Sequence, residues 1–106
     1  MATREYLIAI ALLASLAACG SGILAPFDAE PRSPPKGANE DFSRIGICYN
    51  RETTTPQEIA AMARTNCGPG TTPHLIGQDF LASCPLLTPM RATFACLKPG
   101  AVPPAR

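Results

Sequence analysis

Charge and histidine are both scarce in this chain, and their scarcity excludes several functions. The 106 residues carry nine basic and eight acidic side chains, which leaves a formal net charge of +1. No excess of charge therefore points to nucleic acid as a partner. The only histidine is His74, and no nucleophile, base and orienting group stand in a recognisable catalytic pattern around it. We therefore expect a protein that is not an enzyme.

The spacing of the five cysteines excludes two further kinds of site. No two cysteines are separated by only two to four residues. Structural zinc sites and dithiol redox motifs both need such close pairs, because two sulfur atoms must reach one metal ion or each other from a single turn. We therefore expect neither a metal nor any other cofactor.

A long apolar run is also missing, although a short one stands near the N-terminus. The stretch "YLIAIALLASLAA", Tyr6 to Ala18, has 13 residues, fewer than the roughly 20 that a transmembrane helix needs. It follows a start that contains Arg4 and has the length of an export-signal core. The sequence predicts a signal peptide over residues 1–18, with a retained transmembrane anchor as the alternative.

The end of this run carries a specific motif. Leu16-Ala17-Ala18-Cys19 resembles the lipobox of bacterial lipoproteins. The resemblance implies cleavage between Ala18 and Cys19, a diacylglycerol on the Cys19 thiol and an acylated new amino group. The lipid would make the membrane a partner, because two or three acyl chains hold a protein there almost permanently. Gly20 replaces the aspartate that retains enteric lipoproteins in the inner membrane, which favours the periplasmic face of the outer membrane.

The mature chain is expected to start with a linker. Residues 19–42 contain four prolines and three glycines and show no helical or alternating apolar period. Such a segment buries too little apolar surface to offset its ordering entropy. We expect a lipidated N-terminus and a disordered proline-rich linker that reaches up to roughly 70 Å. Residues 99–106 are expected to be a disordered tail.

Residues 43–98 have the patterns of one small folded domain. Arg44 to Asn50 alternates as a half-buried strand does. Thr55, followed by proline and by Glu58 three residues after it, predicts a capping box for a helix from Pro56 to Asn66. Two further strands are predicted, over His74 to Leu81 and over Arg91 to Leu97.

These elements predict an α+β fold in the order strand, helix, strand, strand. A right-handed crossover would set the first two strands parallel, and the last strand would pair antiparallel. In the same region the chain resembles small proteobacterial lipoproteins of unassigned function, through the stretches "ICYN", "EIAAMARTNC", "CPLLTP" and "RATFAC". That resemblance implies a class of protein and no mechanism.

Four cysteines remain for the domain once Cys19 is lipidated: Cys48, Cys67, Cys84 and Cys96. A domain of about 55 residues has a small core and needs covalent support, and an exported chain reaches an oxidising compartment. Two disulfides are expected, and three pairings are possible. The facing of the predicted elements favours Cys48 with Cys84 and Cys67 with Cys96, because Cys48 lies on the strand face away from the helix.

Two functions remain open. The first is a tethered structural or interaction module that binds an envelope protein or a cell-wall component, with Tyr49, Asn50, Arg51 and the pair Leu86-Leu87 as exposed groups for a partner. The second is a small enzyme or ligand-binding lipoprotein that uses His74 and Asp79. The second requires His74, Asp79 and an arginine to meet in one concave site.

Overall fold

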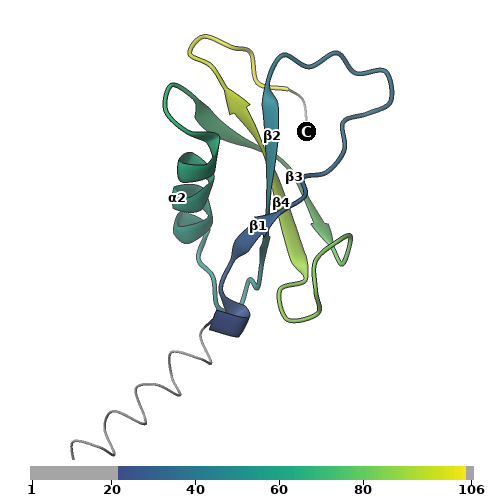
Figure 1. Ribbon diagram of the computed structural model, residues 1–106, viewed down its shortest axis with the longest axis vertical. Helices are drawn as coiled ribbons and strands as arrows, with labels where there is room; N and C mark the ends of the chain where they lie inside the picture. The colour runs from purple at the N-terminus through teal and green to yellow at the C-terminus, as the bar shows by residue number, and fades with distance from the viewer. Residues whose placement is uncertain (1–21, 105–106) are drawn as a thin grey trace, which may run out of the picture.

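The computed structural model describes residues 22–104 and shows a four-stranded sheet with a helix on one face (Figure 1). The predicted signal peptide, the cleavage site between Ala18 and Cys19, and the lipidation site lie outside the described residues. Within residues 22–104, every helix is too short or too polar to cross a bilayer.

The sheet has the strand order β1-β2-β4-β3, and each strand is antiparallel to its neighbours. Its strands are β1 (Phe27–Ala29), β2 (Ser43–Tyr49), β3 (Thr72–Phe80) and β4 (Met90–Leu97). Because β2 and β3 both pair with β4, they run in the same direction with β4 between them. The expected α+β fold and the order strand, helix, strand, strand over residues 43–98 are confirmed.

The helix α2 (Pro56–Cys67) begins where the sequence predicted it. The backbone N–H of Glu58 donates to the Thr55 hydroxyl at 3.2 Å, and the Thr55 N–H donates to the Glu58 carboxylate at 3.1 Å. These two bonds form the predicted capping box, which satisfies backbone donors that the first turn leaves free. Gly68 ends the helix with φ of 84°, a conformation that glycine adopts without strain.

The core lies between α2 and one face of the sheet. β2 contributes Ile47 and Tyr49 to it, and the helix and β4 add Ile59, Ala63, Ala92 and Phe94. Every second residue of β2 and of β4 therefore faces the helix, because successive side chains of a strand point to opposite faces of the sheet.

Two disulfides join the elements. Cys48 of β2 is bonded to Cys84, which lies in the connection between β3 and β4, and their Cα atoms are 5.7 Å apart. Cys67 at the end of α2 is bonded to Cys96 of β4, with a Cα distance of 5.4 Å. This is the pairing that the facing of the elements favoured. One bridge lies on the helix side of the sheet and the other on the opposite side.

The structure corrects the expectation that residues 19–42 form only a disordered linker. Phe27–Ala29 is the edge strand β1, paired with β2 from Phe27 opposite Cys48 to Ala29 opposite Gly46. The next residues, 30–32, cross the sheet on the face away from the helix, and we call them the strap. The Arg32 N–H donates to the Thr93 hydroxyl of β4 at 3.0 Å.

Small residues make room for this crossing. Gly46, Thr93 and Gly77 stand opposite one another on β2, β4 and β3. A Cβ on Gly46 would lie 2.8 Å from the backbone oxygens of Ala29 and Glu30. The chain is thus paired with the domain from Phe27 onward, so residues 19–42 do not form the linker of roughly 70 Å that the sequence predicted.

The C-terminal segment contains no helix or strand within residues 98–104. A single turn is present there, in which the Ala101 N–H donates to the Lys98 carbonyl at 3.1 Å.

Candidate functional site

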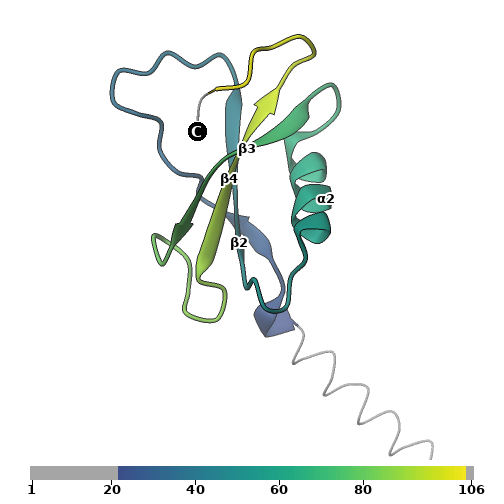
Figure 2. The same cartoon turned by 180° about the vertical axis from the view of Figure 1, so that it is seen from behind.

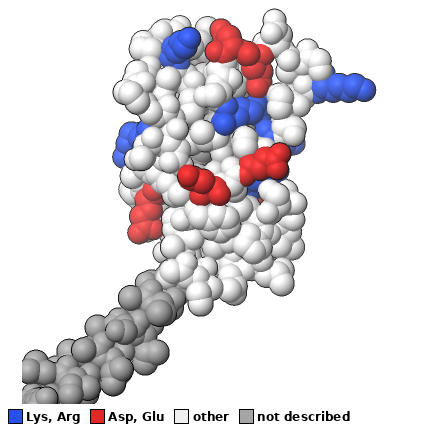
Figure 3. All heavy atoms as spheres, in the orientation of Figure 1, with Lys and Arg blue, Asp and Glu red and all other residues white. Residues whose placement is uncertain are grey.

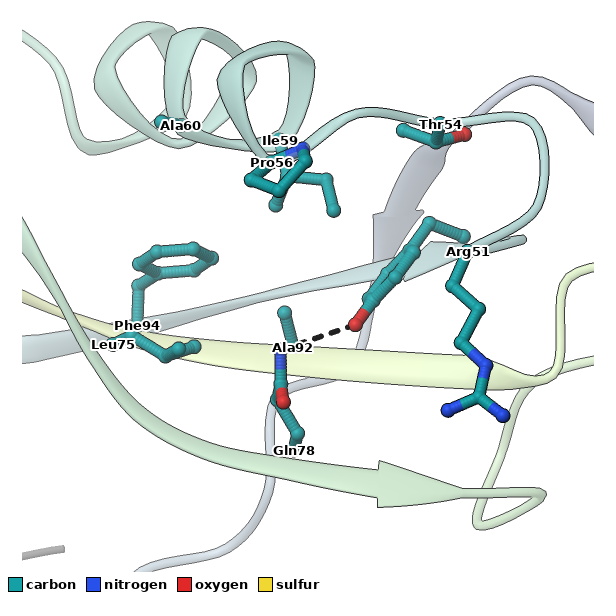
Figure 4. Close-up of a pocket in the computed structure, with 10 residues that line it drawn as sticks. Arg51, Thr54, Pro56, Ile59, Ala60, Leu75, Gln78, Ala92 and Phe94 are labelled. Carbon is teal, nitrogen blue, oxygen red and sulfur yellow. Dashed lines mark hydrogen bonds between the residues drawn. The ribbon is translucent and has the colours of Figure 1, made fainter.

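An apolar groove of about 270 Å³ lies between α2 and the sheet and is open to solvent (Figure 4). Its walls come from every element around the core: Tyr49, Arg51, Thr54, Pro56, Ile59, Ala60, Leu75, Gln78, Ala92 and Phe94. Small side chains, Ala60 from the helix and Ala92 from β4, are among the residues that line the groove. Neither methyl group spans the space between a helix and a sheet, which is about 10 Å between backbones.

Four polar side chains interrupt the apolar wall: Tyr49, Arg51, Thr54 and Gln78. The Tyr49 hydroxyl accepts a hydrogen bond from the Gln78 amide at 3.1 Å, and the hydroxyl proton stays available for a second bond. Figure 4 shows Arg51 at the end of the groove away from Leu75 and Phe94. The groove therefore has a polar end and an apolar end.

The electrostatics keep Tyr49 neutral. Burial raises the pKa of the Tyr49 hydroxyl, and the nearby positive charge of Arg51 opposes that rise only in part. A tyrosine with a raised pKa is protonated at every physiological pH. Its hydroxyl is thus a hydrogen-bond donor for a bound group and is not suited to act as a base.

Asp79, one of the predicted site residues, lies away from the groove. Its two carboxylate oxygens accept from the Arg91 guanidinium at 2.8 and 2.6 Å, on the sheet face opposite the helix. The hydrogen bonds from Arg91, with desolvation opposing them, hold the pKa of the Asp79 carboxyl below its usual range. Arg91 also donates to the Ser83 hydroxyl and to the Glu30 carbonyl of the strap. This carboxylate is a paired structural group.

His74, the other predicted site residue, is separated from that ion pair. On β3, His74 stands opposite Ala95, whereas Asp79 stands opposite Arg91. Four residues along β4 correspond to about 13 Å. The structure therefore does not bring His74 to the pair of Asp79 and Arg91, and none of these three residues lines the groove.

A second ion pair holds the strap from the other side. The Arg44 guanidinium donates to the Glu40 carboxylate at 2.8 Å and to the Arg32 carbonyl at 3.3 Å. The hydrogen bonds from Arg44 to Glu40 lower the pKa of the Glu40 carboxyl. The strap and the ion pair that holds it were not predicted from the sequence, although Gly46 in the middle of a strand is a signal for close approach of another backbone.

The groups that were expected to meet a partner divide into two. Tyr49 is buried, at 5% exposed, and lines the groove with Arg51. Leu86 and Leu87 are exposed, at 81% and 54%, in the connection between β3 and β4. Asn50 joins the two regions, because its amide donates to the Leu87 carbonyl at 3.0 Å. The groove residues Leu75 and Gln78 were not predicted, since their strand shows no distinctive pattern.

The groove lining supplies an apolar surface and hydrogen-bonding groups. Among residues 22–104, no three histidine, cysteine or acidic side chains come together as metal ligands do, and all four cysteines of that range are in disulfides.

Comparisons with models of known protein families, with curated proteins and with solved structures find no match to this chain.

Proposed function

We propose that this protein is a lipid-anchored binding module of the bacterial cell envelope, without catalytic activity, whose groove holds an apolar side chain of an envelope protein. The composition of the groove carries this proposal: an apolar floor together with the hydroxyls of Tyr49 and Thr54, the Gln78 amide and the Arg51 guanidinium. An apolar side chain would be buried against Leu75 and Phe94. A neighbouring carbonyl or carboxylate of the partner would bond to Tyr49 and Arg51.

The same composition favours a protein over a cell-wall glycan as the partner. Sugars need many hydrogen-bonding groups in a site, because each buried hydroxyl that lacks a partner costs free energy. The groove offers few such groups for its length. The enzyme alternative has weaker support, because Asp79 is occupied by Arg91 and His74 lies apart from both.

The anchor is supported by the lipobox residues Leu16 to Cys19 and by the two disulfides, which are typical of exported domains of this size. The experiment that tests it is the intact mass of the protein purified from membranes, with and without reduction. We expect a chain that starts at Cys19, is heavier by a diacylglycerol and an acyl chain, and gains four hydrogens on reduction. An uncut or unlipidated chain would contradict the anchor.

The groove is tested separately by filling it. A photoreactive amino acid in place of Glu52, which is exposed next to Arg51, should crosslink one envelope protein in living cells. Adding Ala60→Leu, which fills the groove from the helix, should abolish that crosslink. Ala61→Leu is the matched control, because Ala61 is exposed on the same helix and does not line the groove. If Ala60→Leu keeps the crosslink while the protein remains folded, the groove is not the binding site.

A further inference from the structure

One end of the domain exposes several large apolar side chains. Phe80 is 63% exposed at the end of β3, and the connection that follows contains Leu81, Leu86 and Leu87, at 45%, 81% and 54% exposed. Ile23, near the start of the described chain, is 59% exposed. We call these five side chains the apolar tip. Single exposed apolar residues are ordinary, whereas five at one end are the mark of an interaction surface.

The N-terminal chain enters the domain at this same end. Phe27 pairs with Cys48, and Cys48 is bonded to Cys84 in the middle of the connection that carries the leucines. Figures 1 and 2, which view the molecule from opposite sides, both place residues 22–24 and the β3–β4 connection at one end of the sheet. Ile23 is four residues after Cys19, a span of at most about 14 Å.

The connection is held rigidly, so the leucines are presented by the fold. The Leu81 N–H donates to the Pro89 carbonyl at 2.8 Å, and the Asn50 amide donates to the Leu87 carbonyl at 3.0 Å. Thr88 is buried, at 1% exposed, and its N–H donates to the Pro85 carbonyl. The disulfide at Cys84 adds a covalent attachment. Little conformational entropy remains to be lost when the leucines are covered.

The two chain segments that carry the tip contain no charged residue. Neither residues 20–27 nor residues 80–90 include a lysine, arginine, aspartate or glutamate. Arg51 and Glu52 border the tip, because they line a hollow together with Phe80. On the face shown in Figure 3, the charged side chains lie over the upper and middle parts of the domain. Apolar side chains enter a lipid interface, whereas charged groups beside them stay at the level of the headgroups.

We infer that the apolar tip inserts into the interface of the same bilayer that holds the lipid on Cys19. This inference rests on the proposed lipid anchor. The short span from Cys19 to Ile23 selects the bilayer over a protein or a second copy, because it keeps the tip within reach of the lipid surface at all times. Tip and anchor together would fix the orientation of the domain, with the ends of β2 and β3 toward the membrane.

The chain has no tryptophan, so a single introduced tryptophan reports on its own surroundings. We would purify the lipidated protein with Leu86→Trp at the tip, or with Val102→Trp as the matched control. Val102 is 87% exposed and follows the opposite end of β4. Both would be placed in phosphatidylcholine vesicles with or without brominated acyl chains. We expect the tip tryptophan to emit at shorter wavelength and to lose most of its emission to the bromines, and the control tryptophan to keep both properties of a solvated ring.

The outcomes separate this inference from the anchor on which it rests. The mass of each sample shows whether diacylglycerol is present before vesicles are made, and its absence would overturn the anchor. A lipidated protein whose tip tryptophan matches the control in both kinds of vesicle would overturn insertion and leave the anchor standing. A blue-shifted tip tryptophan that bromines do not quench would show a protein surface or a second copy on the tip, which also overturns insertion.

Discussion

At the scale of single residues, two arginines decide where the N-terminal segment lies. Arg44 and Arg91 each bind a carboxylate and each donate to a carbonyl of the strap, at 3.3 Å to Arg32 and 3.4 Å to Glu30. The acids hold the guanidinium groups in place, and the guanidinium groups hold the strap. The two ion pairs thus position the strap and have no role in catalysis that the structure shows.

Gly46 is the residue on which this crossing depends most. Gly46→Ala would place a methyl group 2.8 Å from the oxygens of Ala29 and Glu30, which are backbone atoms and cannot swing aside. We expect the free energy of unfolding to fall by about 1–3 kcal/mol, measured by urea denaturation. Gly77→Ala is the control, because its methyl group would meet only the flexible Arg32 side chain at 3.5 Å. Equal losses for both variants would contradict the account of the strap.

Asp79 is expected to make the stability depend on pH. Its carboxyl has a lowered pKa in the folded protein, so its contribution is complete above about pH 5, where the unfolded carboxyl with a pKa of about 3.9 is also ionised. The contribution is lost as the pH falls through the folded pKa. Asp79→Asn should cost about 1 kcal/mol at neutral pH, a value that allows for solvent screening of a half-buried pair.

The difference between Asp79→Asn and the unaltered protein should therefore shrink toward zero as the pH falls below the folded pKa of Asp79. Thermal unfolding at a series of pH values measures it. Asp41→Asn is the control, since among residues 22–104 the exposed Asp41 takes part in no ion pair. A loss for Asp79→Asn that stays constant down to the lowest pH would show that the ion pair is not its cause.

At the scale of elements, local patterns predicted what neighbouring residues along the chain determine. The helix α2 was predicted to within one residue, Asn66 against Cys67, because its cap and its glycine stop act within one turn. The strands β2 and β4 followed from their alternation, and β3 (Thr72–Phe80) was predicted over His74 to Leu81. β1 was missed because three residues, of which two are exposed, cannot show a period, and because proline-rich surroundings indicate a linker.

The bridge between Cys67 and Cys96 attaches the end of α2 to β4 across 29 residues. Replacing both cysteines by alanine should reduce the free energy of unfolding by about 3 to 4 kcal/mol in the chain-entropy model, which is a large share of the stability of so small a domain. Chemical denaturation measures the free energy of unfolding of this variant and of the double alanine variant at Cys48 and Cys84. That second disulfide joins residues 36 positions apart, so its loss should cost a similar amount. A variant at Cys67 and Cys96 that is as stable as the original would contradict this role.

At the scale of the whole molecule, the groove and the apolar tip arise from contacts between distant segments. The groove needs residues of α2, β3 and β4 to come together, which depends on where α2 crosses the sheet. The tip needs residues 22–24 and the β3–β4 connection to meet at one end. Leu86 and Leu87 were predicted to be exposed, and the tertiary structure adds that they lie at the end where the N-terminal chain enters.

The sequence by itself determined the α+β class, the order of strands and helix over residues 43–98, and a preferred pairing of four cysteines. These features depend on periodicity, capping and side-chain facing, which are interactions between residues a few positions apart. Only the tertiary structure decided the strap, the groove and the separation of His74 from Asp79. The hydrogen bond from Arg32 to Thr93 joins residues 61 positions apart. Such a contact forms only when the whole sheet is packed, so no pattern among neighbouring residues predicts it.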